Sequence, residues 1–418
     1  MELDKNPLVT VNPSRLKFLL EQYGLSHSDF LNLINANRKN AILTAESLTA
    51  ILANKQPILL NHLAAIDKIF EKGISWYLSL HELPEKKKMS IFFRKESFNS
   101  QLDFKSKKTI DEFETKKKEI ALLCQYINFE PKRILATFSI KNDPKTTSTQ
   151  VRRIVFERQN ILKSQKLIKD PESDVQYLKN LIKVLESFNI FIFEFIENWN
   201  VKRPAIFNGF FMHPNFIAIK NQRYTRREIF TLVHEFAHYL LNIEEIDEPI
   251  DAAQDNASAI ENWCNDFTYY FLIGDFTDAL DKIVNADSSN NFAEAIISEL
   301  YKKTFLSRKA LYTHLKIFNR ISGADYKKII AEIDAAITRA QTERKQEAAD
   351  KRQHLIDQGK ELPGFGQKAI PSGLFKEIVT TNYFEGNIDE TRLCQYLKIK
   401  PENFEREVYS IEKEKEAN

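Results

Sequence analysis

The chain has 418 residues, 43% of them hydrophobic, and its acidic and basic side chains nearly balance at a net charge of +2. This length allows two or three domains, and the apolar content excludes a largely disordered chain. The near-neutral charge neither requires nor excludes a nucleic-acid partner. The 3 cysteines are far apart and form no CxxC pair, which argues against a disulfide framework and for a reducing compartment.

Two features of the chain predict a cytoplasmic protein without a membrane partner. The amino terminus has no apolar signal region. The most apolar short run, residues 190–196, is too short to span a bilayer and carries a charge.

Short helices are predicted over residues 12 to about 80. Asn12 followed by Pro13 is typical of a helix start, and Gly24 is expected to end this first helix. A second helix follows a Gly-Leu-Ser turn, and residues 44–52 predict a third.

This set of short helices has two interpretations, and the residues leave both open. One is a helix-turn-helix DNA reader, with Arg38 and Lys39 just ahead of the third helix. The other is a helical protein-interaction module, because no dense basic stripe or clear set of base-reading side chains follows.

Basic residues gather in the next part of the chain, and three strands are predicted after it. The basic runs are usually solvated faces, and a phosphate-binding surface is the minority interpretation. The strands are rich in Ile and Phe and separated by turn residues, and a sheet edge beside the following helix can pair with an extended peptide. The basic runs lie at 86–88, 105–108 and 116–118, and the strands at 190–196, 205–211 and 216–220.

The next helix carries His234, Glu235 and His238 in the order His-Glu-Phe-Ala-His. The two histidines stand at i and i+4, so they share one helix face and can reach one zinc ion at about 2.0–2.1 Å. Glu235 projects about 100° away, where it is a poor ligand but a suitable base. Zinc lowers the pKa of a bound water from about 15.7 towards 7, so the pattern favours a peptide-bond hydrolase.

The alternative is that these histidines are structural. A histidine on an apolar helix is usually a core residue, the flanking Phe230, Val233 and Leu240 resemble core positions, and the pattern can also arise by chance. The strands before the helix and the acidic residues after it favour the metal site.

Catalytic zinc sites take three protein ligands and keep one position open. Glu261, near the start of a predicted helix, is the best third candidate, and Asn265 lies one turn later on the same face. A capping box with Ser258 would instead use Glu261 on the backbone, and Cys264 is a rival ligand. Composition alone does not choose between these and the acidic residues of the intervening loop, which are Glu244, Glu245, Asp247, Asp251 and Asp255.

The carboxy-terminal part is predicted to be helical. Residues 305–315 resemble a second short helix-turn-helix element, and a long charged helix is expected at about 325–358. Residues 362–418 contain a Gly-Phe-Gly turn and two further short helices.

Residues 230–238 and 261–267 resemble the ImmA/IrrE family of zinc metallopeptidases. The resemblance implies that His234, His238 and Glu261 bind one zinc ion and that Glu235 is the general base. It also implies an α+β, mainly helical fold, in which a zincin-like catalytic domain packs a small β-sheet on the HExxH helix between helical domains. Family members typically cleave a repressor-type transcription regulator, others act in toxin–antitoxin or phage-related settings, and many long members carry an amino-terminal helix-turn-helix domain.

The predicted function is therefore a zinc endopeptidase that cleaves a repressor or antitoxin in stress response, mobile-element control or phage defence. Asn265 is expected to orient Glu261 or a ligand histidine. The rivals are a DNA-binding transcription regulator with a structural or sensory metal site, and a peptidase toxin. No electrophilic residue is assigned, and the candidates are Tyr239, Tyr269 and His314.

Four domains are predicted along the chain. They are a helix-turn-helix-like domain at 1–82, a basic and mostly helical connector at 83–175, the metallopeptidase domain at 176–320 and a helical regulatory domain at 321–418.

Overall fold

The computed structural model describes residues 7–36, 42–81, 104–196, 207–222, 224–244, 259–359 and 369–416. These residues form two compact units, 7–116 and 117–416, and helix α7 (Phe104–Tyr126) crosses the boundary between them. The fold is α+β and mainly helical, as predicted, with one sheet of two strands and one of three among the described residues. The four predicted domain ranges stay predictions.

The amino-terminal unit is built from short helices at the predicted places. The Asn12 side chain accepts a hydrogen bond from Ser14 N, Pro13 is the first residue of α1, and Gly24 ends α1 in the left-handed conformation at φ 61°. The elements are β1 (Leu8–Val9), α1 (Pro13–Tyr23), α2 (His27–Asn35), α3 (Ala45–Leu52), β2 (Ile58–Leu59), α4 (Leu60–Phe70) and α5 (Ile74–Leu78), and β1 pairs antiparallel with β2.

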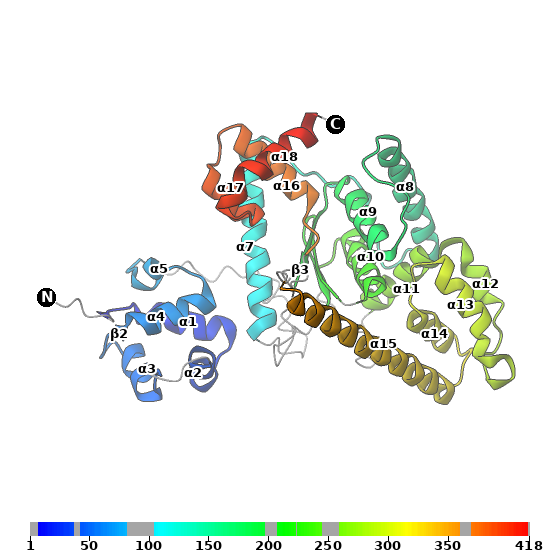
Figure 1. Cartoon of the computed structure of the whole chain (residues 1–418), viewed down its shortest axis with the longest axis horizontal. Coiled ribbons are helices and arrows are strands. Elements are labelled where there is room, and N and C mark those ends of the chain that lie inside the picture. Colours follow the sequence, from blue (N-terminus) through cyan, green and yellow to red (C-terminus); the bar gives the residue numbers. More distant parts are fainter. Residues whose placement is uncertain are drawn as a thin grey trace. The chain divides into compact units, whose positions relative to one another are not determined.

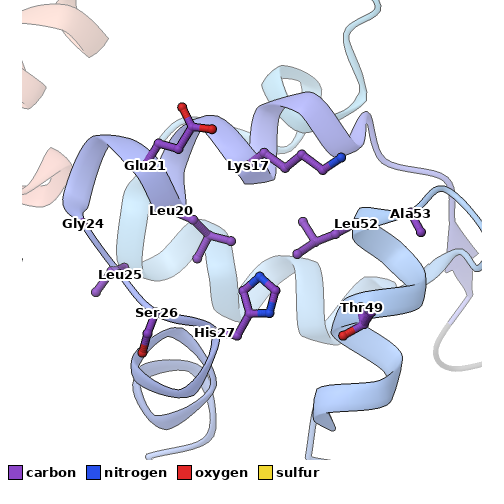
Figure 2. A pocket seen from close by; sticks show the side chains of 10 residues that line it. All are labelled: Lys17, Leu20, Glu21, Gly24, Leu25, Ser26, His27, Thr49, Leu52 and Ala53. Atoms are coloured by element: carbon purple, nitrogen blue, oxygen red, sulfur yellow. The ribbon is translucent and has the colours of Figure 1, made fainter.

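A groove of ≈ 710 Å³ lies between α1, α2 and α3. Figure 2 shows the imidazole of His27 between Leu20 and Leu52, with Lys17 and Glu21 at the rim. The groove therefore combines an apolar floor with a few charged side chains.

The described surface of this unit is not basic. The described residues of this unit, 7–36, 42–81 and 104–116, carry 9 Lys and Arg and 8 Asp and Glu side chains, and Glu46 is the one charged residue of α3. A DNA-binding domain usually gathers Lys and Arg on one face. Arg38 and Lys39 lie outside the described residues, so DNA binding stays a prediction.

The second unit contains the predicted three-stranded sheet. Its strands are β3 (Phe191–Phe195), β4 (Gly209–Met212) and β5 (Phe216–Lys220), and the first two residues of the predicted middle strand lie outside the described residues. The order is β3-β5-β4, with β3 parallel and β4 antiparallel to β5. Side chains on both faces are buried, so the strands read as apolar runs rather than as an alternating pattern.

Helices pack around this sheet (Figure 1). The helix α10 (Thr225–Leu241) packs against β4 and β5, and α9 (Asp174–Glu186) packs against β3 and α10. The helix α11 (Ala259–Ile273) contacts both α10 and α8 (Pro144–Ser164). This packing brings two helices that are distant in sequence, α10 and α11, side by side.

The chain after α11 returns to helices, as predicted, and the long charged helix forms as α15 (Gly323–Asp357). A later helix, α16 (Gly373–Phe384), contacts the sheet, because the ring of Phe375 lies edge-on to Phe193 at a centroid distance of 5.4 Å. None of the described helices is long and apolar enough to cross a membrane. The other elements are α12 (Thr277–Asp281), α13 (Glu294–Lys303), α14 (Arg308–Ile317), α17 (Glu390–Leu397), α18 (Phe404–Glu416) and the short 3-10 turns Gly274–Phe276, Ser288–Ala293 and Pro401–Asn403.

Candidate metal centre

The helix α10 places polar side chains inside the core. It begins after Tyr224, carries Glu228 in its first turn and ends at Asn242 in the left-handed conformation, φ 58°. All its residues from Thr231 to Leu241 are buried. Polar groups buried to this degree require hydrogen-bond or metal partners, so the buried polar side chains of α10 must have such partners nearby.

Three side chains from α10 and α11 converge on one point. His234 Nε2 lies 3.2 Å from His238 Nε2 and 3.2 Å from Glu261 Oε2, and His238 Nε2 lies 3.5 Å from Glu261 Oε1. Both imidazoles are at most 1% exposed, and the Glu261 side chain is 16% exposed. Among the described residues this is the one group of three or more His, Cys, Asp and Glu side chains placed to share a metal ion.

These distances fit a tetrahedral metal ion. Ligand atoms at about 2.0–2.1 Å from a tetrahedral zinc are separated from one another by about 3.3 Å. The spacings of 3.2, 3.2 and 3.5 Å match this value. Two imidazole nitrogens that face each other at 3.2 Å also require a proton or a cation between them. The donor set and its spacing therefore suit a shared metal ion.

The pKa of Glu261 reflects its position beside the two imidazoles. Burial raises the pKa of this carboxyl group, but hydrogen bonds from His234 and His238, and their positive charge when protonated, outweigh burial and hold the pKa well below its usual range. Glu261 is therefore an anion at neutral pH, which is the form that binds a metal ion.

Glu235 follows the ligand His234 directly and projects about 100° around α10 from it. It is fully buried, and it approaches the first residue of β4, since a Cβ atom built on Gly209 would lie 2.9 Å from Glu235 Oε1. The ligand histidines instead meet Glu261 of α11. Glu235 therefore lies next to the ligand face, at the 100° step that separates neighbouring helical residues, but is not one of the three clustered side chains.

The other predicted residues lie in different surroundings. Asn265 is half-buried one turn after Glu261 and makes no hydrogen bond to Glu261 or the histidines within the described residues, so its orienting role stays a prediction. Cys264 is fully buried in the core around α11. Glu244 accepts a hydrogen bond from His213 N at 2.7 Å. The capping partner Ser258 and the other acidic candidates Glu245, Asp247, Asp251 and Asp255 lie outside the described residues.

The three candidate electrophiles pack as core aromatic rings. Tyr269 stacks on His314 at a centroid distance of 3.7 Å, and the guanidinium of Arg133 lies 3.8 Å from the ring centre of Tyr239. Burial raises the pKa of both tyrosines, and burial lowers the pKa of His314 to about 4. These contacts explain all three residues as packing, so none is assigned a catalytic role.

Two residues near the site were missed in the sequence. Arg133 donates hydrogen bonds to Tyr239 O and Leu135 O and so satisfies a carbonyl in the last turn of α10. Arg133 is 106 residues from Tyr239, and no local signal reveals the pairing. Gly209 does carry a signal, because a glycine inside a predicted strand marks a close backbone approach.

Glu228 gives a pH-dependent prediction. Burial, with a smaller contribution from the charge of Glu194, raises the pKa of Glu228 from 4.5 to about 8, although Gln222 N donates a hydrogen bond to it. Between these two values the folded state binds more protons than the unfolded state, so the free energy of unfolding should fall as pH rises. We expect Glu228→Gln to flatten this slope and to be more stable than the wild type near pH 8, in urea titrations.

A matched control for this prediction is Glu299→Gln. Glu299 is exposed, and a hydrogen bond from Lys303 at 2.6 Å lowers its pKa. It should therefore not change the slope above about pH 5. An unchanged slope in Glu228→Gln would mean that Glu228 is not protonated in the folded protein.

Comparison with known proteins identifies one segment. Residues 185–280 match the family model Peptidase_M78, described as an IrrE N-terminal-like domain. The match contains all three strands, the helix α10 and the helix α11 that carries Glu261. No curated protein and no solved structure matches the chain.

Proposed function

We propose, from the match of residues 185–280 to the IrrE N-terminal-like family model, that the protein is a zinc-dependent endopeptidase of the ImmA/IrrE type. The single observation that carries the proposal is the convergence of His234, His238 and Glu261 at 3.2–3.5 Å spacing. Two histidines and a glutamate form a typical protein ligand set for a catalytic zinc ion. When bound there, zinc acts as a Lewis acid that activates water and polarises a carbonyl group.

The chain supplies the remaining steps through its own groups. His234 and His238 would hold the cation as neutral imidazoles, and Glu261 would add a negative charge to the site. Glu235 accepts the proton of the attacking water and then donates it to the leaving amine. Deep burial of Glu235 keeps bulk water away from this proton transfer.

An extended segment of a protein is the proposed substrate. The strand β4 contacts α10 and pairs with β5 along one edge only, as far as strands are described. A strand at a sheet edge can bind an extended peptide through main-chain hydrogen bonds. A repressor or antitoxin-type regulator that exposes such a segment is the substrate class we propose, in stress response, mobile-element control or phage defence.

A reducing, cytoplasmic compartment is part of the proposal. Cys124, Cys264 and Cys394 are all buried thiols. Proteins of oxidising compartments instead tend to cross-link their cysteines as disulfides.

The proposal can be tested with the full-length protein and a mixed pool of peptides from a digested proteome. Protein stripped by a chelator and reloaded with zinc should produce new internal cleavages that mass spectrometry detects. Chelated protein should produce none. An equal cleavage pattern with and without zinc, or no cleavage in either sample, would reject the peptidase function.

The amino-terminal unit distinguishes this proposal from a DNA-binding regulator. Its balanced charge supports a protein-docking role. DNA binding by the full-length protein would weaken steeply with salt, and Arg38→Glu combined with Lys39→Glu would weaken it further. We expect gel-shift titrations with DNA from its own locus to show no such complex at low salt. A salt-sensitive complex would favour the regulator.

A further inference from the structure

Gly209, the first residue of β4, lies against the carboxylate side of α10. A Cβ atom at this position would lie 2.8 Å from Thr231 Cγ2, 2.9 Å from Glu235 Oε1 and 3.0 Å from Glu235 Cγ. Real Cβ atoms are essentially never found closer than 3.0 Å to a heavy atom. The Glu235 carboxylate therefore occupies the space that any side chain at position 209 would need.

Backbone conformation does not explain the glycine. The φ angle of Gly209 lies outside the left-handed region, so an alanine can adopt this backbone without strain. The close approach of α10 is the remaining reason for a residue without a Cβ atom.

The backbone on neither side of this contact can easily move away. Gly209 pairs with Ile219 of β5, and the preceding carbonyl of Asn208 accepts a hydrogen bond from Lys220 N at 2.7 Å. Thr231 and Glu235 are at most 2% exposed and belong to the same helix as the ligand histidines. An added methyl group would consequently displace the most adjustable element, which is the Glu235 side chain.

We propose that Gly209 is a positioning residue that holds the Glu235 carboxylate in the orientation needed for proton transfer. The inference rests on the proposed function, since it gives Glu235 the role of the base. The backbone at the start of β4 forms one wall for this carboxylate, while α11 independently positions the third metal ligand. The helix α10 thus carries both the base and two metal ligands, with β4 positioning the base and α11 supplying the third ligand.

Gly209→Ala should lower kcat and leave the metal in place. A displacement of the reacting group by about 1 Å can cost about 100-fold in rate, so we expect a fall in kcat of about 10- to 100-fold. KM should stay within about twofold, because peptide binding does not use this carboxylate. Gly323→Ala is the matched control, since Gly323 has no atom within 4 Å of an added Cβ and should behave like the wild type.

Two further variants separate positioning from loss of folding. Thr231→Ser removes the methyl group nearest to the added Cβ and keeps the hydroxyl that accepts a hydrogen bond from Gln222. Added to Gly209→Ala, it should recover stability but not kcat. Glu235→Ala removes the second obstacle, so Gly209→Ala should lower the urea midpoint less in this background than in the wild type.

The comparison of urea midpoints for Gly209→Ala in the wild-type and Glu235→Ala backgrounds does not depend on enzymatic activity. If the wild type cleaves no peptide, the proposed function fails, yet coupling between positions 209 and 235 in the urea midpoints still reports their contact. Equal destabilisation in both backgrounds, or failure of every Gly209→Ala variant to fold, would show that the methyl does not act through Glu235. A folded Gly209→Ala variant with wild-type kcat would equally overturn the positioning role.

Discussion

Replacement of Glu235 by glutamine is expected to leave the metal bound and to lower peptide cleavage by about 10²–10⁴-fold, the usual contribution of a general base. Glutamine has the size of glutamate but cannot accept a proton from water. Because the side chain is fully buried against β4 and is not part of the ligand cluster, the exchange should disturb neither the fold nor the metal site. Cleavage rates and metal content measured on the same sample test both parts.

Glu228→Gln is the matched control for this experiment. Glu228 lies seven residues earlier on the same buried helix, so the chemical change and the surroundings are similar. It should retain wild-type cleavage near neutral pH. If Glu235→Gln keeps more than about a tenth of the activity, the proton acceptor is another group. If both variants lose activity equally, the loss reflects a general disturbance of α10.

The strands and the metal helix could be predicted because their signals are local. Runs of Ile and Phe between turn residues mark β3, β4 and β5, and the i, i+4 histidines mark one face of α10. These patterns depend on residues within one or two turns of each other. The structure therefore shows these elements within a few residues of the expected bounds.

The third ligand could not be derived in the same way. Glu261 lies 27 residues after His234, and its approach depends on how α11 packs against α10. Glu261 is the best candidate in the sequence, but Cys264 and several acidic side chains are rivals that composition alone does not exclude. The resemblance to a family, and not the physical pattern, singled out Glu261, and the structure places its carboxylate beside both imidazoles.

Long-range contacts of the carboxy-terminal part could not be predicted from local sequence patterns either. Glu186 at the end of α9 accepts hydrogen bonds from Ser372 Oγ at 2.5 Å and Gly373 N at 3.1 Å, across 186 residues or more. These contacts cap the start of α16 with a side chain from another helix. In the sequence Ser372 alone resembles a helix cap, and nothing nearby indicates a buried glutamate as its partner.

Loss of Glu261 should remove the metal. The Glu261→Ala variant keeps two histidines, whereas catalytic zinc sites need three protein ligands. The loss in affinity should exceed the roughly 10–100-fold that follows removal of an outer partner of a ligand. Zinc should raise the thermal midpoint of the wild type but not that of the variant, because only a bound ion stabilises the folded state. Metal analysis after dialysis gives a second measure.

Three control variants make the Glu261 result specific. Asp266→Ala removes a carboxylate from the same helix, and Asp251→Ala and Asp255→Ala remove rival carboxylates that lie outside the described residues. All three should retain zinc, since the ligand cluster consists of His234, His238 and Glu261. Full zinc retention in Glu261→Ala together with zinc loss in Asp251→Ala or Asp255→Ala would assign the third ligand to that aspartate. In that case, the short distances between Glu261 and the two imidazoles would reflect an ion pair and not a shared metal ion.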